Sequence, residues 1–267
     1  MIISIPKHLL KNSNIFKKHS TFENTVNFSD SNNNLIAIHP YYVTKSPFAI
    51  IVKLEKNEFN NFFDTITYLQ IDNNFLYLDN HKYNLNAVLL SNHDLLSLSL
   101  NQKVSENKLR HILNSIDNIL ENTNKKTIYQ DILANKITDF EISFETNDYI
   151  KSLNNLIGFG EGLTPSGDDI ICGTLAGLLL ANNITLFETL KDQTKTVLTL
   201  NKTSIFSYTF LNYAFLGLFI EHVYNLYLTN DIDDIISKIS NMGHRSGIDY
   251  LIGIKIGIKK GGILYDL

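Results

Sequence analysis

One pattern of residues occurs twice in this chain and restricts how the chain can fold. Residues 166–177 and residues 246–257 both follow Ser-Gly-x-Asp-x-x-x-Gly-x-x-x-Gly without a gap. A glycine inside a helix costs up to about 1 kcal/mol relative to alanine, so two glycines in each helix need a packing reason. Glycines four residues apart share one helix face and let another backbone approach closely. We therefore expect two helices that cross through their glycines, with their N-termini converging on one site.

The start of each predicted helix also follows a shared pattern. Ser166 precedes Asp169 by three residues, and Ser246 precedes Asp249 in the same way. This spacing is a variant of the capping box, with aspartate in place of glutamate. We expect the two serines to cap the helices, although Thr164, followed by a proline, offers a competing helix start.

The loop before the first helix is unusually rich in glycine. Gly158, Gly160 and Gly162 alternate ahead of the run Thr-Pro-Ser-Gly-Asp-Asp. A glycine-rich loop that leads into a helix brings backbone N–H groups close to a ligand, and the positive end of the helix dipole favours an anion. Plain helix caps do not need three preceding glycines. We therefore favour a binding site for a small anion, such as phosphate or a carboxylate, over a purely structural cap.

Three acids beside this loop complicate the electrostatics. Asp168, Asp169 and Asp249 would repel an anion unless they serve as caps or a cation such as Mg²⁺ lies between them. They are candidate Mg²⁺ ligands, and no other cofactor is expected. The simplest interpretation is a small anionic substrate, with aspartate and His244 transferring protons. Surface roles for His244 and for Arg245 have equal weight with functional ones.

Composition excludes several classes of protein. Hydrophobic residues make up 44% of the 267 residues, which is typical of a globular chain. A net charge of −4 provides no basic field for general nucleic-acid binding. No apolar run approaches the ~20 residues of a membrane span, and the N-terminus lacks the features of a signal peptide. Cys172 is the single cysteine, which fits a reducing compartment. We expect a cytoplasmic protein that binds neither nucleic acid nor membrane.

The residue patterns divide the chain into two parts of different fold class. Short apolar runs between turn-forming residues recur through residues 1–104, which predicts a β-rich sandwich or small barrel. From residue 105 onward, apolar residues recur at helical spacing, beginning with a helix that Ser105 would cap. We therefore predict an α+β protein with a β-rich region at 1–104 and an α-helical region at 105–267.

Three segments resemble the signature of a known family. They are Gly160-Glu161-Gly162-Leu163-Thr164-Pro165-Ser166-Gly167-Asp168-Asp169, then Thr203-Ser204, then Gly243-His244-Arg245-Ser246-Gly247-Ile248-Asp249. Together they are similar to the family of AllH, a subunit of oxamate carbamoyltransferase. That family usually has proline where this chain has Glu161, and threonine or serine where it has Arg245. The resemblance covers residues 157–257.

The resemblance implies transfer of a carbamoyl group between oxamate and phosphate in anaerobic allantoin and purine catabolism. In the catabolic direction, oxalurate and phosphate would give oxamate and carbamoyl phosphate, with FdrA-like and AllG-like subunits as partners. Asp169 and Asp249 would orient the amide nitrogen or a metal, and His244 would shuttle a proton. The substrate would be bound by Gly160, Gly162, Thr164, Ser166, Gly167, Asp168, Ser246 and Gly247.

Two alternatives to this function come from other classes. In the first alternative, the chain is a non-catalytic subunit that binds a ligand or holds its partners together. Otherwise it would be a Mg²⁺-dependent enzyme that acts on another small anion through Asp168, Asp169 and Asp249.

Overall fold

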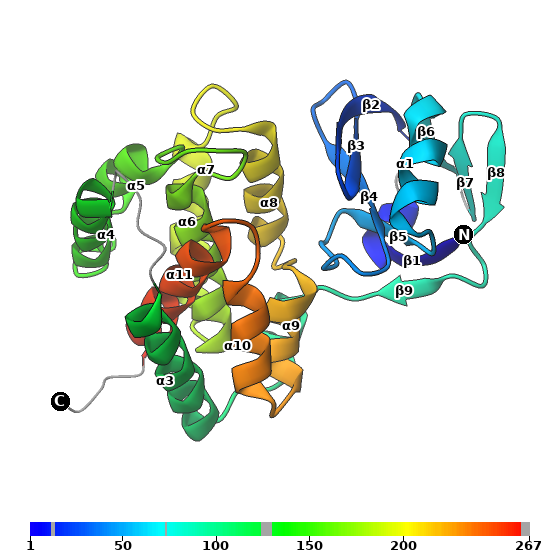
Figure 1. Cartoon of the computed structure of the whole chain (residues 1–267). Helices are drawn as coiled ribbons and strands as arrows, with labels where there is room; N and C mark the ends of the chain where they lie inside the picture. Colours follow the sequence, from blue (N-terminus) through cyan, green and yellow to red (C-terminus); the bar gives the residue numbers. More distant parts are fainter. Residues whose placement is uncertain (12–13, 73, 124–129, 263–267) are drawn as a thin grey trace. The chain divides into compact units, whose positions relative to one another are not determined.

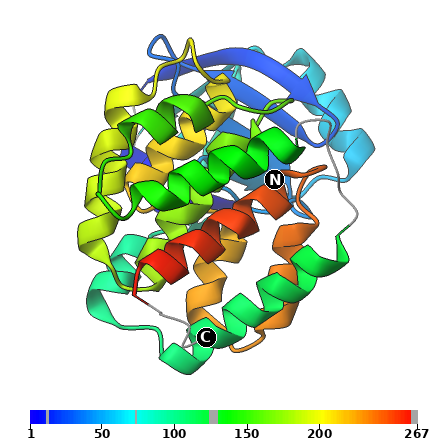
Figure 2. The same cartoon turned by 90° about the vertical axis from the view of Figure 1, so that its left-hand side faces the viewer.

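The computed structural model describes residues 1–11, 14–72, 74–123 and 130–262 (Figures 1 and 2). The chain divides into two compact units, Met1–His93 and Asp94–Leu267. The first unit contains the strands, and the second contains helices α2 to α11. This order of elements confirms the predicted α+β class. In the described ranges, no helix is both long enough and apolar enough to cross a membrane.

The N-terminal unit is built on one nine-stranded sheet, in the order β8-β7-β6-β2-β3-β4-β5-β1-β9. Adjacent strands run antiparallel except in the pairs β1–β9 and β4–β5, which are parallel. The strands are β1 (Ile2–Pro6), β2 (Ile15–Phe22), β3 (Thr25–Ser29), β4 (Leu35–Pro40), β5 (Ala49–Val52), β6 (Tyr68–Asp72), β7 (Phe75–Leu78), β8 (His81–Asn84) and β9 (Leu89–Ser91).

One helix, α1 (Lys56–Thr65), contributes to the core of this unit. Its Phe59 and Phe63 are fully buried, with ring centroids 4.7 Å apart. Residues four apart lie on the same helix face, so both rings enter the core together. Every residue of β4 and β5 is buried as well, which is typical of strands covered on both faces.

A buried histidine in β4 makes this unit sensitive to acid. The ring of His39 lies 2.9 Å from the Thr25 hydroxyl, and burial lowers the His39 pKa to about 4. Below pH 6.5 the unfolded chain takes up a proton that the folded chain excludes, so stability falls as the pH drops toward 4. A difference of this size corresponds to about 3 kcal/mol. Denaturant unfolding of the full chain between pH 7 and 4 should show this loss.

A matched pair of variants isolates the contribution of this histidine. His39→Asn should flatten the pH dependence of unfolding between pH 6.5 and 4. His19→Asn changes an exposed histidine of the same unit and should leave the pH dependence as it is. An unchanged slope in His39→Asn would contradict the assignment.

The C-terminal unit begins with helices α2 to α5, which precede the first glycine motif. The helix predicted from residue 105 onward is α3, which Ser105 caps by accepting the Lys108 N–H at 3.3 Å. The helices are α2 (Leu95–Asn101), α3 (Glu106–Asn122), α4 (Gln130–Ser143), α5 (Ile150–Leu156), α6 (Ser166–Leu180), α7 (Ile184–Val197), α8 (Ile205–Phe215), α9 (Glu221–Leu228), α10 (Ile232–Ser240) and α11 (Ser246–Lys260).

Helix α6 is the centre of this unit. All of its residues from Gly167 to Leu180 are buried. It packs against α2, α7, α8 and α11, and α11 in turn packs against α3 and α10 (Figures 1 and 2). The two glycine motifs therefore lie on adjacent helices with other helices around them.

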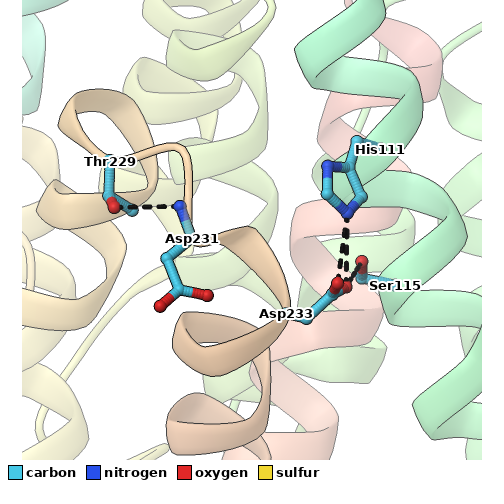
Figure 3. Close-up of polar contacts among 5 residues, drawn as sticks. All are labelled: His111, Ser115, Thr229, Asp231 and Asp233. Atoms are coloured by element: carbon cyan, nitrogen blue, oxygen red, sulfur yellow. Dashed lines mark hydrogen bonds and ion pairs between the residues drawn. The ribbon is translucent and has the colours of Figure 1, made fainter.

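Helices α3 and α10 are joined by a small polar cluster (Figure 3). The Asp233 carboxylate accepts the Ser115 hydroxyl, and His111 Nε2 lies 3.3 Å from its Oδ1. The Ser115 hydrogen bond is the main cause of a lowered Asp233 pKa. The three residue types are those of a hydrolase triad, but here the carboxylate lies between serine and histidine. The histidine therefore cannot take the serine proton, and the cluster serves to connect two helices.

Candidate functional site

Helices α6 and α11 cross through their glycines, as the sequence predicts. A Cβ atom added to Gly173 would lie 2.1 Å from the carbonyl oxygen of Tyr250. A Cβ added to Gly253 would lie at the same distance from the carbonyl oxygen of Ile170. Real Cβ atoms are not found so close to a backbone oxygen, so each position requires glycine. The contacts are reciprocal, which means that the two motifs are related by an approximate twofold axis.

The second glycine of each motif extends this contact. A Cβ added to Gly177 would lie 2.9 Å from the Cα of Gly257, and the reciprocal distance is 2.8 Å. The two backbones are therefore in contact over more than one turn. This packing fixes the relative position of the two helix starts.

The two helix starts meet, as predicted. The Thr164 and Ser246 hydroxyl oxygens are 2.7 Å apart and share a hydrogen bond, which we call the hydroxyl bridge. Each serine also acts on the acid of the opposite helix: Ser246 opposes the rise in the Asp169 pKa, and Ser166 opposes the rise in the Asp249 pKa. The repeated motif therefore builds one shared polar cluster.

The expected capping role of Ser166 and Ser246 is wrong. Each serine is the first residue of its helix, and the N-cap residues are Pro165 and Arg245, neither of which caps through its side chain. The competing start, with Thr164 as cap and Pro165 inside the helix, is wrong for the same reason. The serine hydroxyls instead lower the pKa values of the acids on the other helix.

The physical reason lies in the backbone of the preceding loops. The Gly167 N–H donates to the Phe159 carbonyl at 2.9 Å, and the Gly247 N–H donates to the Met242 carbonyl at 3.1 Å. These hydrogen bonds satisfy backbone N–H groups in the first turn of each helix, to which the side chain of an N-cap residue would otherwise bond. Both N–H groups, which the sequence assigns to substrate binding, are therefore used within the protein.

The glycine-rich loop adopts a backbone that other residues rarely take. Gly158, Gly160 and Gly162 all have positive φ, at 73°, 127° and 87°. A Cβ on Gly158 would lie 1.8 Å from the Lys202 carbonyl oxygen, whereas nothing lies within 4 Å of one on Gly162. The first of these glycines therefore serves packing, and the third faces open space.

Asp168 holds this loop in place. Its Oδ1 accepts the Gly158 N–H at 2.9 Å, and its Oδ2 accepts the Thr203 hydroxyl. Burial raises the Asp168 pKa, and these hydrogen bonds oppose that rise. Both oxygens are bonded to the protein, so Asp168, which the sequence assigns to substrate binding, positions the loop.

The Thr203-Ser204 segment of the signature has a structural explanation. Ser204 caps α8 by accepting the Ser207 N–H at 3.0 Å, and its hydroxyl donates to the Leu163 carbonyl. With the bond from Thr203 to Asp168, the turn before α8 is tied to the glycine-rich loop at two points. The sequence indicates the cap but not the attachment to the loop, because that contact joins distant segments.

A cavity of about 550 Å³ opens on one side of the hydroxyl bridge. It brings together most of the predicted site: the glycine-rich loop, His244 and Asp249. It also includes Arg245, which the sequence left open. Its lining residues are Leu133, Phe159, Gly160, Glu161, Gly162, Leu163, Thr164, Ser166, Gly243, His244, Arg245, Ser246 and Asp249.

A second cavity of about 220 Å³ lies on the other side of the bridge. It shares Thr164, Gly243 and Ser246 with the first cavity, and it contains Asp169 rather than Asp249. The two predicted catalytic acids therefore face different cavities. Its lining residues are Thr164, Asp168, Asp169, Cys172, Ser207, Phe210, Leu211, Ile220, Met242, Gly243, Ser246 and Tyr250.

The two acids also differ in electrostatic environment. Asp249 Oδ1 accepts the Arg245 Nε–H at 2.9 Å, and both side chains are largely buried. Burial raises the Asp249 pKa, but Ser166 and Arg245 oppose this rise. Asp169 has no such cation; burial, together with repulsion from Asp249 and Asp168, raises its pKa well above the usual value. The pKa of Asp169 is therefore raised well above its usual value, whereas Arg245 limits the rise at Asp249.

The pairing of Arg245 with Asp249 was not predicted, although the spacing of the two residues indicates it. Arg245 and Asp249 are opposite charges four residues apart at a helix start, a spacing at which side chains meet. At the matching position before Asp169 the chain has Pro165. This difference makes the two acids unequal, together with Asp168, which raises the Asp169 pKa and has Ile248 at its matching position.

The acids do not form a ready-made metal site. Within the described ranges, no group of three or more His, Cys, Asp or Glu side chains is placed to hold a metal ion. Asp168 and Asp249 already accept hydrogen bonds from Gly158, Thr203 and Arg245. Binding of Mg²⁺ stays a prediction.

Comparison with known proteins tests the family resemblance. No curated protein and no solved structure matches the chain. Residues 156–258, which contain both glycine motifs and the hydroxyl bridge, match the family model described as oxamate carbamoyltransferase subunit AllH, and this confirms the resemblance predicted from the sequence.

Proposed function

We propose that this chain is a subunit of oxamate carbamoyltransferase and that the reacting carbamoyl group lies at the hydroxyl bridge. The observation that carries the proposal is the meeting of Thr164 and Ser246 between two unequal acids, inside the segment that matches the AllH family. In the catabolic direction, phosphate attacks the carbamoyl carbon of oxalurate. The products are carbamoyl phosphate and oxamate.

The first cavity suits the anionic reactants. Arg245 and His244 line it together with the glycine-rich loop. Oxalurate, oxamate, phosphate and carbamoyl phosphate are all small anions, which cations and helix N-termini attract. The transfer passes through a tetrahedral carbon with negative charge on its oxygen, and the bridge hydroxyls are donors for that oxygen.

The unequal acids suit the two proton requirements of the transfer. A phosphate oxygen forms the new C–O bond as the C–N bond to oxamate breaks, and the leaving oxamate nitrogen needs a proton. Asp169, whose pKa burial raises well above its usual value, is the group that we assign to supply that proton. Asp249, paired with Arg245, accepts the N–H of the nitrogen that links the carbamoyl group to oxamate, and so orients the substrate. His244 returns the proton from solvent to the site.

Partner chains complete the enzyme in this proposal. The word "subunit" in the family description supports a multi-subunit complex. FdrA-like and AllG-like chains are the partners that the signature implies, in cytoplasmic allantoin and purine breakdown. The reaction would not be expected from this chain alone.

The test is reconstitution. This chain should be co-expressed with FdrA-like and AllG-like subunits, and carbamoyl phosphate formation from oxalurate and phosphate should be measured. Activity that depends on this chain supports the proposal. A complex that forms but shows the same activity when Thr164 and Ser246 are both changed to alanine would instead favour a non-catalytic, ligand-holding subunit. Activity lost to a chelator and restored by Mg²⁺ would assign the acids to a metal.

A further inference from the structure

The second cavity differs from the first in charge. No lysine, arginine or histidine is among the described residues that line it, whereas Asp168 and Asp169 are. The remaining lining includes the apolar side chains of Phe210, Leu211 and Ile220 and the hydroxyl groups of threonine, serine and tyrosine residues. A phosphate or carboxylate would meet carboxyl groups here without a compensating cation. The chemistry favours an uncharged ligand.

Two buried polar groups in this wall have unused hydrogen-bonding capacity. Oδ2 of Asp169 is buried and has no hydrogen-bond partner, and Asp169 is 9% exposed. The Ser207 hydroxyl is also buried and makes no hydrogen bond of normal geometry, although it lies close to Asp168. An unsatisfied buried group costs about 1–3 kcal/mol, and a bound ligand that supplies the partner removes this cost.

We propose that the second cavity binds an uncharged primary amide, with the amide N–H directed at Asp169 Oδ2. A primary amide offers two N–H donors and one carbonyl acceptor, which complement a carboxyl oxygen and nearby hydroxyl groups. The volume of about 220 Å³ suits a group of a few atoms and not a large ligand. The apolar wall keeps water from competing for these hydrogen bonds.

The amide site also divides the substrate between the two cavities. If the proposed function holds, the amide is the H₂N–C(=O) end of the carbamoyl group, and this assignment rests on that function. The amide end lies in the second cavity and the anionic end in the first, with the reacting carbon at the hydroxyl bridge between them. Binding of a simple amide does not depend on the transfer reaction.

The experiment compares two ligands of almost the same shape. The full chain is titrated with acetamide and with acetate at neutral pH, and binding is followed by thermal unfolding and by NMR chemical shifts. Acetamide should bind and raise the unfolding temperature, and acetate should bind at least tenfold more weakly. Equal binding of the two, or no binding of acetamide, would overturn the proposal.

Two variants locate the site. Ser207→Val fills part of the second cavity and removes its hydroxyl, and it should weaken acetamide binding at least tenfold. Ser207→Ala is a milder change for the case that valine prevents folding, and it should weaken binding about threefold or more. Ser237→Val makes the same chemical change at an exposed position of α10 and should bind acetamide as the parent chain does. Unweakened binding in both Ser207 variants would place the amide elsewhere.

The outcomes separate this proposal from the proposed function. In one outcome, the chain binds acetamide, Ser207→Val abolishes that binding, and the complex forms no carbamoyl phosphate. This result keeps the amide site and overturns the transferase assignment. An active complex whose chain binds no acetamide keeps the transferase assignment and overturns the amide site.

Discussion

Gly173→Ala should destabilise the helical unit by about 4 kcal/mol or more. The new Cβ would lie 2.1 Å from the Tyr250 carbonyl oxygen and 3.0 Å from the Ile254 nitrogen. Both atoms belong to the backbone of α11, so no side chain can rotate away. The helices must move apart, which opens the packing along the whole crossing. Denaturant unfolding monitored by circular dichroism measures the loss.

Gly162→Ala is the matched control for this change. Nothing lies within 4 Å of a Cβ at this position, and its φ of 87° is the only penalty. We expect a cost of about 1–2 kcal/mol from that backbone strain. If Gly173→Ala costs no more than Gly162→Ala, the close crossing of α6 and α11 is wrong.

Asp169→Asn should reduce carbamoyl transfer by the reconstituted complex at least hundredfold while the fold stays intact. Asparagine has the shape of a carboxylic acid but cannot give a proton to the leaving nitrogen, and loss of general acid catalysis costs about 10²–10⁴ in rate. The free energy of unfolding should fall far less than the transfer rate, because the substitution removes a buried carboxyl group that has an unpaired oxygen. The rate is measured as carbamoyl phosphate formed, alongside the midpoint of unfolding.

The control for this variant changes a carboxylate outside the site. Asp192→Asn alters an exposed residue of α7 and should leave the transfer rate within about twofold of the parent chain, as is usual for surface positions. Full activity of a folded Asp169→Asn complex would show that Asp169 does not supply the proton. The proposed catalytic role would then have to be abandoned.

The helix crossing was predictable because its cause is local. Glycines four residues apart in two otherwise apolar helices have few uses other than close packing, and the repeat supplied both partners. The predicted contact of Gly173 and Gly177 with the second motif is therefore the part of the site that the sequence predicts best. The change from β-rich to helical patterns predicted the fold class for the same reason, since periodicity is a property of each segment.

The capping roles could not be predicted, because a serine before an acid has more than one use. Ser166 is close in sequence to Asp169 but lowers the pKa of Asp249, and Ser246 lowers the pKa of Asp169 instead of that of its own neighbour. Sequence spacing describes what a residue can reach within its own helix. It does not describe exchange of partners between helices, which depends on the crossing geometry.

The different environments of Asp169 and Asp249 could be predicted from the sequence only in part. The motifs share their serine, acid and glycine positions, but Arg245 precedes one and Pro165 the other, and Asp168 in one is matched by Ile248 in the other. Only burial turns this difference into a chemical one, because in water an unpaired carboxyl group would ionise in the same way as a paired one. The division of the polar cluster into two cavities was not visible at all, since it depends on side chains from α8 and the preceding loops.

The reciprocal glycine contact also has a consequence for folding kinetics. Helices α6 and α11 are separated in sequence by α7, α8, α9 and α10, so their contact closes a long stretch of chain. Contacts of this kind form slowly and are costly to make before the intervening segments have ordered. We therefore expect the hydroxyl bridge to form late in folding, after the intervening helices have ordered. A ligand bound across the bridge would stabilise the whole unit and slow its opening.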